Sequence, residues 1–408
     1  MLRTKLALLG LAVVLVAGCA GPPGPIQAVP LADIQKAAPS VDQAKAIATF
    51  GEQLFAQVRE GGEPNPVISP LSVFYALGMA GDGAAGDTAA AFEKVLGLTA
   101  EQARQVAAYL LAELSEPGEG TTLSSAQSVW LDDQFTVKQD WVDRVAAYYR
   151  ADAIRTDLAN PGAAGLVNAW INQKTNGLIP SMLDSLDPDA VALLVNALYL
   201  KADWARTFDT NDTTQGTFTT ESGAEVEAYY LSATLGSARY LDTGSATGIV
   251  LPYKDGRLGF LAAMPKSGQL ALDGSTIAGL LAAAKDQSNV ELRMPKFDTK
   301  FGADLAPALS ELGLGVAFEG TADFSAMTSE SVRISRALHK VSMSVGEKGT
   351  EAAAATVVEM VPTSAQLDEP LLLSFNRPYV YAVVDLTTGV PLFVGAMDDP
   401  SKAPPAAR

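Results

Sequence analysis

Side chains that carry out covalent chemistry in enzymes are scarce in this sequence. Its 408 residues include one histidine, His339, and one cysteine, Cys19. One histidine excludes a histidine-rich metal site, and one cysteine excludes a zinc ribbon or a thiol relay. The sequence has no Gly-x-Ser-x-Gly elbow, no Ser-x-x-Lys pair and no phosphate-binding glycine loop. We therefore expect no metal and no cofactor, and we do not expect an enzyme.

Two catalytic arrangements stay open on residue types alone. His339 could serve a Ser-His-Asp triad, although a lone histidine in the apolar segment Ala337 to Val345 is more often a satisfied core residue. Paired carboxylates for glycoside hydrolysis could come from the 46 acidic residues, but no cluster of sugar-stacking aromatic side chains accompanies any pair. The net charge of −17 makes nucleic acid a poor partner, because phosphate binding requires clustered lysine and arginine.

The most informative segment runs from Glu347 to Ala355, because it suits a chain that moves between two environments. Gly349 provides a backbone pivot with few steric limits, and the alanines after Glu351 are small enough to enter almost any packed site. The segment from Thr356 to Pro370 that follows has the composition of an exposed loop. The pattern therefore indicates a protein whose function depends on a conformational change.

Local rules leave two conformations open for this segment. Alanine and glutamate favour a helix, which Thr350 could cap and Pro362 would follow. A strand would instead place the even-numbered side chains from Thr350 to Met360 on one face. Both charged residues, Glu351 and Glu359, would then lie on the opposite face. Propensity alone does not decide between the two.

The N-terminus has the features of an export signal. Residues 1–18 contain a basic start, an apolar core too short to span a bilayer comfortably, and a small-residue cleavage site before Cys19. This ending resembles a bacterial lipobox, in which the cysteine becomes lipidated, and a plain secretory signal is the alternative. We expect residues 19–40, rich in proline, glycine and alanine, to be a tether. The expected product is an exported cell-envelope lipoprotein held to a membrane through Cys19, or an extracellular protein.

Helical periodicity dominates the first half of the chain, and strand patterns dominate the second. We expect helices over 41–58, 88–96, 100–114, 140–149 and 162–175, and one that begins after Ser69-Pro70. We expect strands over 192–201, 215–220, 228–231, 248–252, 258–265, 290–295, 337–345, 378–386 and 392–397. Helices followed by strands, without regular alternation, favour an α+β fold. The expected organisation is one domain from 41 to 400, with a disordered tail over 401–408.

Five motifs occur in order along the chain. They are Asn65 to Ser72 with Gly83 to Thr88, Asn168 to Ile171 with Thr175 to Ile179, Leu194 to Tyr199 with Lys201 and Trp204, Glu347 to Ala355, and Phe375 to Tyr379 with Pro391 to Gly395. Together these motifs resemble the serpins, a family of serine protease inhibitors, and the resemblance covers nearly everything after the tether. It implies a monomer with about nine helices packed on three β-sheets and an exposed reactive loop.

The resemblance implies roles for particular residues. The hinge would insert into a central sheet as a new strand, and its even-numbered side chains would become buried only after the loop is cut. A polar cluster, here called the shutter, would lie where the sheet opens, and a tryptophan would lie at the breach, where the loop first enters. A satisfied core cluster and a large core aromatic residue are the structural alternatives. The implied hinge residues are Glu347, Gly349, Thr350, Glu351, Ala352, Ala353, Ala354 and Ala355, and the implied shutter and breach residues are Ser69, Ser72, Asn168, Asn196, Trp204 and His339.

The resemblance also implies a mechanism. The target protease would attack the loop as a substrate and would be trapped as an acyl-enzyme, so the protein would act as a suicide substrate. Counting seventeen residues from Glu347 places the reactive bond between Thr363 and Ser364. A small β-branched residue after proline suits an elastase-like or subtilisin-like serine protease, with a cysteine protease as a further option. The loop is long on its C-terminal side, so cleavage at Met360, Gln366 or Leu367 is an alternative, and so is a non-inhibitory binding protein of the same fold.

Overall fold

A computed structural model describes residues 24–26, 36–116, 118–175, 177, 179–187, 189–350 and 369–405. Cys19, the hinge residues from Glu351 to Ala355, and the Thr363–Ser364 bond lie outside the described residues. Among the described residues there are eight α-helices and two hydrogen-bonded sheets. The helices are α1 (Val41–Glu60), α2 (Pro70–Gly81), α3 (Gly86–Leu96), α4 (Ala100–Leu114), α5 (Gln139–Tyr149), α6 (Ala163–Lys174), α7 (Thr276–Ala283) and α8 (Ala306–Leu309).

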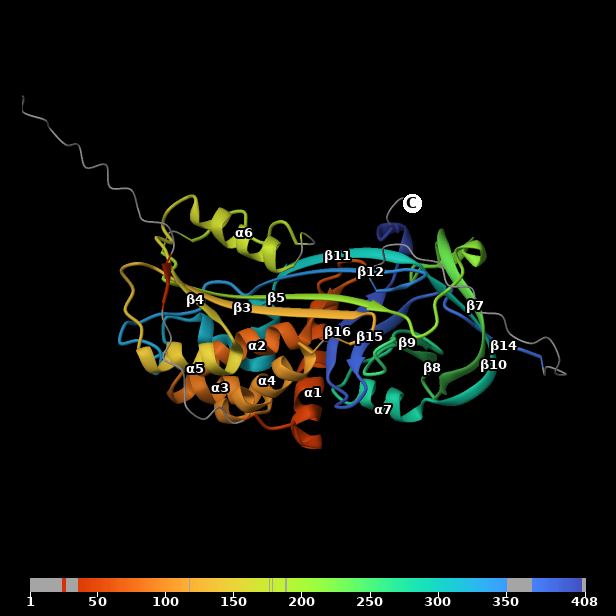
Figure 1. The fold of residues 1–408 in the computed structure, drawn as a ribbon, viewed down its shortest axis with the longest axis horizontal. Coiled ribbons are helices and arrows are strands. Elements are labelled where there is room, and N and C mark those ends of the chain that lie inside the picture. The colour runs from red at the N-terminus through yellow and green to blue at the C-terminus, as the bar shows by residue number, and fades with distance from the viewer. Residues whose placement is uncertain are drawn as a thin grey trace, which may run out of the picture.

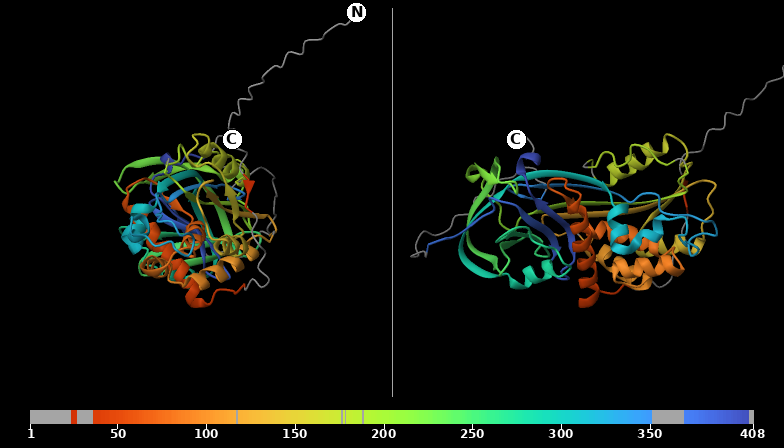
Figure 2. Two further views of the ribbon diagram at one scale, coloured as in Figure 1. Left: turned by 90° about the vertical axis from the view of Figure 1, so that its left-hand side faces the viewer. Right: turned by 180° about the vertical axis from the view of Figure 1, so that it is seen from behind.

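Helices α1 to α5 lie on one face of a long central sheet, and α6 lies on the other face (Figure 1, and from behind in Figure 2). Local sequence explains where several of them begin. A capping box starts α1, in which Ser40 accepts from the backbone of Gln43 while the Gln43 side chain accepts from Ser40 N. Ser69 caps α2, and Pro70 occupies its first turn. Helix α2 is apolar on nearly every side and buried along its length, so it forms the centre of the core.

The central sheet has seven strands in the order β1-β4-β3-β5-β13-β12-β11. Its two long inner strands, β3 and β5, pair antiparallel from Thr121↔Ala202 to Leu131↔Ala192. The bounds are β1 (Gly24–Pro25), β4 (Asp152–Arg155), β3 (Thr121–Leu131), β5 (Ala192–Asp203), β13 (Gly349–Thr350), β12 (Leu338–Val345) and β11 (Phe297–Asp304).

The second sheet follows the order β14-β10-β7-β8-β9-β15-β16-β2, and β6 pairs with β7. The resemblance implied three sheets. Successive stretches of β7 pair with β6, β10 and β8, so continuous hydrogen bonding links two of these three sheets. The bounds are β14 (Leu371–Ser374), β10 (Lys285–Pro295), β7 (Glu225–Asp242), β8 (Ala246–Pro252), β9 (Leu258–Pro265), β15 (Tyr379–Asp385), β16 (Pro391–Met397), β2 (Val67–Ile68) and β6 (Thr214–Thr219).

Several expected boundaries differ from the structure. Strand β3 was not predicted, because it is rich in serine, threonine and glutamine and owes its conformation to eleven paired rows with β5. The tail predicted to be disordered from 401 is ordered at Ala403, which is buried and accepts a hydrogen bond from Asp298 N at 3.2 Å. The predicted tether is also wrong in part, because β1 lies within it and pairs with β4.

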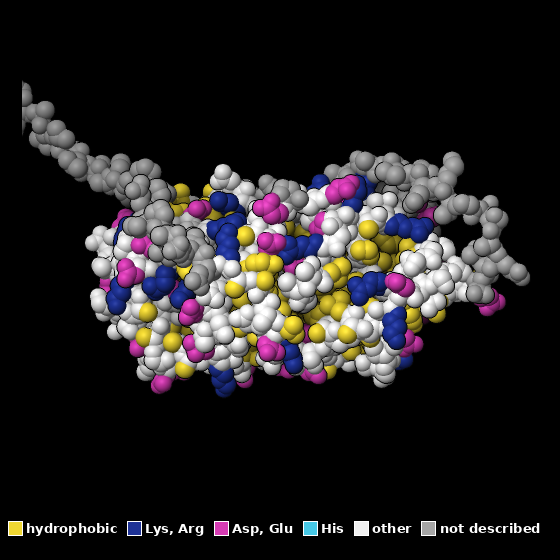
Figure 3. Space-filling model, turned by 60° about the horizontal axis from the view of Figure 1, so that its bottom comes forward, with side chains coloured by type: hydrophobic (Ala, Val, Ile, Leu, Met, Phe, Trp, Pro, Cys, Tyr) yellow, Lys and Arg dark blue, Asp and Glu magenta, His cyan; other side chains and the backbone are white. Residues whose placement is uncertain are grey.

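The distribution of charge on the surface bears on the expectation that nucleic acid is a poor partner. On the face drawn in Figure 3, acidic and basic side chains are interspersed rather than gathered by sign. Within the described ranges, every helix falls short of the length and apolarity that crossing a bilayer requires.

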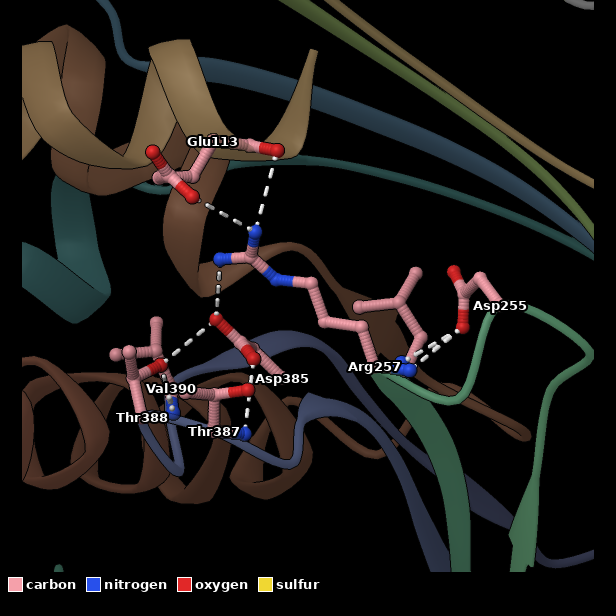
Figure 4. A network of polar contacts seen from close by, with 8 residues as sticks. Glu113, Asp255, Arg257, Asp385, Thr387, Thr388 and Val390 are labelled. Carbon is pink, nitrogen blue, oxygen red and sulfur yellow. Dashed lines mark hydrogen bonds and ion pairs between the residues drawn. The ribbon is translucent and has the colours of Figure 1, made fainter. Parts of the chain in front are cut away.

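A polar network joins the helical layer to the second sheet (Figure 4). The Arg257 guanidinium lies 2.9 Å from the buried Asp385 carboxylate and also contacts the backbone oxygen of Glu113, at the end of α4, at 3.2 Å. Asp385 accepts further hydrogen bonds from the Thr387 backbone and the Thr388 hydroxyl, both at 3.0 Å. The ion pair and these hydrogen bonds compensate the burial of the Asp385 carboxylate.

We predict that Asp385→Asn lowers the free energy of unfolding by about 3 kcal/mol, because it leaves the partly buried Arg257 without its close anion. Urea unfolding followed by circular dichroism measures the change. The matched control is Glu113→Gln, whose carboxylate is 45% exposed and 3.5 Å from Arg257. It should cost less than about 1 kcal/mol. Equal losses in the two variants would contradict this account of the network.

Candidate functional site

The candidate site lies where β12 ends and the hinge begins. After Val345 the chain makes a tight turn in which Gly346 and Gly349 exchange backbone hydrogen bonds at 2.9 and 3.3 Å. Strand β13 then lies between two others, because Thr350 pairs with Val345 of β12 and with Ala202 of β5. Thus the first hinge residues are already part of the central sheet.

Gly349 is required at this position by the close approach of the neighbouring strand. A Cβ atom built on it would lie 1.9 Å from the carbonyl oxygen of Ala202, which is far inside van der Waals contact. The sequence identified this glycine as a pivot. The structure adds a second reason for it, since any larger residue would push β13 away from β5.

Thr350 is 2% exposed, and its hydroxyl lies 2.6 Å from the hydroxyl of Tyr253. The expectation that Thr350 becomes buried only after cleavage is therefore wrong. Its pairing with both neighbouring strands and its contact with Tyr253 bury it, whereas the predicted hinge residues after it lie outside the described residues. The site thus contains an inserted strand of two residues.

Trp204 holds the segment that precedes the hinge. Its indole nitrogen donates to the Gly346 carbonyl at 2.9 Å, and its backbone N–H donates to the Lys348 carbonyl at 2.7 Å. The indole stacks on the Tyr253 ring, with centroids 4.7 Å apart and an interplanar angle of 5°. The resemblance placed Trp204 at the entry point of the loop, and these contacts put it beside the first hinge residues.

Glu347 is buried at the same end of the sheet and is held by charge. Its carboxylate lies 2.9 Å from the Lys296 ammonium and accepts from the Thr213 hydroxyl at 3.0 Å. Burial opposes ionisation, but Lys296 and the hydrogen bonds to the carboxylate together hold the pKa of Glu347 below its ordinary value. The hinge therefore begins at an ionised, anchored residue.

The predicted shutter is mostly present as one connected group. Ser69 N donates to His339 Nε2 at 3.0 Å, and Ser72 N donates to Ser69 Oγ at 3.2 Å. The Ser72 hydroxyl in turn donates to the Asn196 side chain. These residues come from the start of α2, from β12 and from β5, so the group connects the core helix to both strands that flank β13.

Asn168 does not belong to this cluster, so the prediction that placed it in the shutter is wrong. It lies on α6, across the sheet from α2. Its side-chain oxygen accepts from Met182 N at 2.8 Å and Leu183 N at 2.9 Å, and its amide donates to Leu183 O at 2.7 Å. Asn168 therefore fixes the segment that returns from α6 to the sheet.

The environment of His339 makes it a poor catalytic base. The imidazole is buried, and burial lowers its pKa to about 4. Its Nε2 already accepts the Ser69 N–H and is therefore not directed at a serine hydroxyl. Across the described residues, no group of three histidine, cysteine or acidic side chains is placed to hold a metal ion.

The site also contains residues that sequence reasoning missed. Tyr253, Lys296 and Thr213 carry the contacts to Thr350 and Glu347, yet each lies more than fifty residues from the hinge. No local motif marks them, and only the pairing of distant strands brings them to the end of β12. In the described part of the chain, no ladder joins β5 directly to β12, so β13 alone lies between them.

We predict that Glu347→Gln lowers the free energy of unfolding by about 1–3 kcal/mol at neutral pH, because Lys296 is left partly buried without its anion. The contribution of Glu347 should be present above the ordinary pKa of 4.5 and should disappear as pH falls through its lower, folded-state pKa. Urea unfolding between pH 3 and 7 measures both effects. The control is Asp242→Asn, since the ion pair of Asp242 with Lys266 is about half exposed. A similar loss in the control would refute the special role of the buried pair.

We predict that His339 makes the free energy of unfolding depend on pH between about 4 and 6.5. In this window His339 binds a proton in the unfolded chain but not in the folded one. Stability should fall as pH falls through this window, by at most about 1.4 kcal/mol per pH unit from this residue. Comparing His339→Gln with the parent protein in urea isolates the effect, because the carboxylates are common to both. Parallel pH profiles would show that His339 does not titrate in this way.

Comparison with known proteins agrees with this architecture. A family model described as serpin (serine protease inhibitor) matches residues 45–400. An uncharacterized serpin-like protein of Thermococcus kodakarensis is 30% identical over 380 residues, covering 90% of this chain and 88% of the relative. Alpha-1-antiproteinase S of Cavia porcellus is 29% identical, covering 89% and 92%. The native crystal structure of the thermophilic serpin tengpin superposes with a TM-score of 0.82 at 27% identity, covering 92% of this chain and 97% of tengpin. The chain therefore belongs to the serpin family.

Proposed function

We propose that this serpin inhibits serine proteases as a suicide substrate, through insertion of its hinge into the central sheet. Protease inhibition is the function that its family description and its antiproteinase relatives support. The observation that carries the insertion step is β13, which already lies between β5 and β12 and is paired with both. The strand that would trap a protease has begun to form at its first two residues.

The register of β13 specifies how insertion would continue. Because Thr350 pairs with Ala202 in an antiparallel ladder, each further residue should advance by one position down β5. Even-numbered residues would then share the face of Leu200 and Leu198, which are buried. Odd-numbered residues would share the opposite face, starting beside the half-buried Lys201. Thr356 would arrive in register with Asn196, the shutter residue whose side-chain nitrogen is buried without a hydrogen-bond partner.

The free energy for trapping would come from the backbone of the inserted strand. About ten inserted residues would gain on the order of 10 kcal/mol, at about 1 kcal/mol net for each hydrogen bond. This amount is comparable with the whole stability of a typical domain. The uncleaved protein would therefore be held kinetically in a state of higher free energy.

The covalent step uses only the catalytic groups of the target. The serine oxygen of the protease attacks the carbonyl carbon of Thr363, and an ester forms as the Thr363–Ser364 peptide bond breaks. The amine of Ser364 leaves with a proton supplied by the histidine of the protease. Insertion then moves the acyl-enzyme before water can hydrolyse the ester. The sequence Pro362-Thr363 favours an elastase-like or subtilisin-like target, and a cysteine protease would form the corresponding thioester.

The cellular setting forms part of the proposal. The segment before Cys19 would direct export, and lipidation of Cys19 would hold the inhibitor at a membrane of the cell envelope as a monomer. Cys19 and the export signal lie outside the described residues, so this element rests on the sequence.

The proposed function is tested by incubating the protein with elastase and with subtilisin and resolving the products on denaturing gels. We expect a stable band at the summed mass of inhibitor and protease, and mass spectrometry of the released C-terminal peptide should place the cut after Thr363. Cleavage without any stable complex would reject trapping and would favour a non-inhibitory serpin.

We predict opposite outcomes for two neighbouring hinge variants. Ala352→Arg should convert the inhibitor into a substrate that is cut without forming a complex, because residue 352 would enter beside the buried Leu200. Glu351→Arg places the same side chain on the opposite face, beside the half-buried Lys201, and should retain most of the complex. The ratio of complex to cleaved inhibitor on gels measures both. Equal ratios for the two variants would rule out the register given by β13.

A further inference from the structure

The short strand β1 attaches the N-terminal segment to the outer edge of the central sheet. Gly24 pairs with Arg155 and Pro25 pairs with Ile154, both on β4. The backbone N–H of Ile26 donates to Ala153 O at 2.8 Å, and the Ile26 side chain packs partly buried against the core. A segment expected to be a free tether is therefore docked five residues after Cys19.

The docking point lies at the opposite end of the sheet from the hinge. Strand β4 pairs with the Leu131 end of β3, whereas β13 lies in the row of Ala202 and Thr121, at the other end. The ten residue-to-residue steps of β3 from Thr121 to Leu131 span about 33 Å. In Figure 1, β4 accordingly lies at one end of the molecule and β14, to which the reactive loop returns, lies at the other.

We propose that β1 is a releasable clamp that orients the lipid-anchored inhibitor. This inference rests on the lipidation and trapping proposed above. Five residues reach at most about 17 Å, so a lipid on Cys19 would hold the β4 edge next to the membrane surface. The hinge end would then point away from the membrane, where a soluble protease can reach the reactive loop.

Insertion would bring a trapped protease back to the clamped end. Continuing the register of β13 places Thr363 in the row of Asp189, just beyond the start of β5 at Ala192. A protease of roughly 200 residues is about 40 Å across, and it would arrive beside β1. It would compete for space with a membrane held within about 17 Å.

The clamp has the weakness that release requires. Strand β1 is only two residues long, and Ile26 adds one backbone hydrogen bond after it. Release would lengthen the anchor from five residues to the twenty-two that separate Cys19 from Val41, where α1 begins. This longer segment reaches about 75 Å at full extension. That length leaves room for a protease about 40 Å across between the membrane and the β4 end of the sheet.

Orientation can be measured by energy transfer from a dye on the protein to acceptor lipids in vesicles. The lipidated full-length chain would carry the dye on Asn160→Cys, near β4, or on Ser222→Cys, in the β6–β7 turn near the hinge, both of which are exposed. We expect at least twofold stronger transfer from position 160. Ile26→Asp should abolish this difference, and Val41→Asp, at a residue 86% exposed, should leave it unchanged. If the chain that keeps Ile26 gives equal energy transfer from positions 160 and 222, the proposal that β1 orients the inhibitor is wrong.

Release can be tested by locking the clamp with a disulfide between Pro25→Cys and Ile154→Cys, which are direct partners across the ladder. On vesicles, the oxidised lock should reduce the yield of covalent complex with elastase by at least fivefold, and a reductant should restore it. The same lock combined with Cys19→Ser has no anchor and should trap equally in both redox states. Equal trapping by oxidised and reduced forms on vesicles would overturn release. Failure of the anchorless form to trap at all would reject the proposed function instead, and the energy-transfer result would still decide the orientation.

Discussion

The structure depends on one feature of the central sheet, which is that β5 and β12 flank a position inside the sheet where a further strand can be added. Both strands present backbone hydrogen-bonding groups to this position, and in the described part of the chain only Gly349 and Thr350 occupy it. Paired backbone groups are favoured over unpaired ones wherever water is excluded. The sheet therefore defines the place, the direction and the register in which a further strand can be accommodated.

Two groups of side chains lie beside this position. At the hinge end, Trp204, Tyr253 and the Glu347–Lys296 ion pair fix the turn that leads into β13. Farther along the sheet, Ser69 and His339 connect the start of α2 to β12, and Ser72 connects it to β5. Separating β5 from β12 must disturb the second group, since its hydrogen bonds reach both strands. The chain thus contains an anchored starting point and, beyond it, a polar connection that has to rearrange.

Local sequence predicted the parts of the fold that carry strong local signals. The capped helices α1 and α4 and the almost wholly apolar strand β9 were found close to their observed bounds. Strand β3 was missed because its polar residues are stabilised by pairing with β5, and the length of β7 was underestimated because different stretches of it pair with different strands. Asn168 was misplaced because its motif specifies the residue type, whereas its hydrogen bonds are made with the segment after α6.

The sequence by itself determined the residue types that allow insertion, namely a glycine pivot and small side chains. It also determined that the charged residues Glu351 and Glu359 would lie on one face of a strand. It also determined the scarcity of catalytic groups, because composition requires no coordinates. Only the tertiary structure decided that Thr350 is already buried, that Glu347 is paired with Lys296, and that β1 docks at the far end of the sheet. These facts depend on contacts between residues far apart in the chain, which local propensities do not encode.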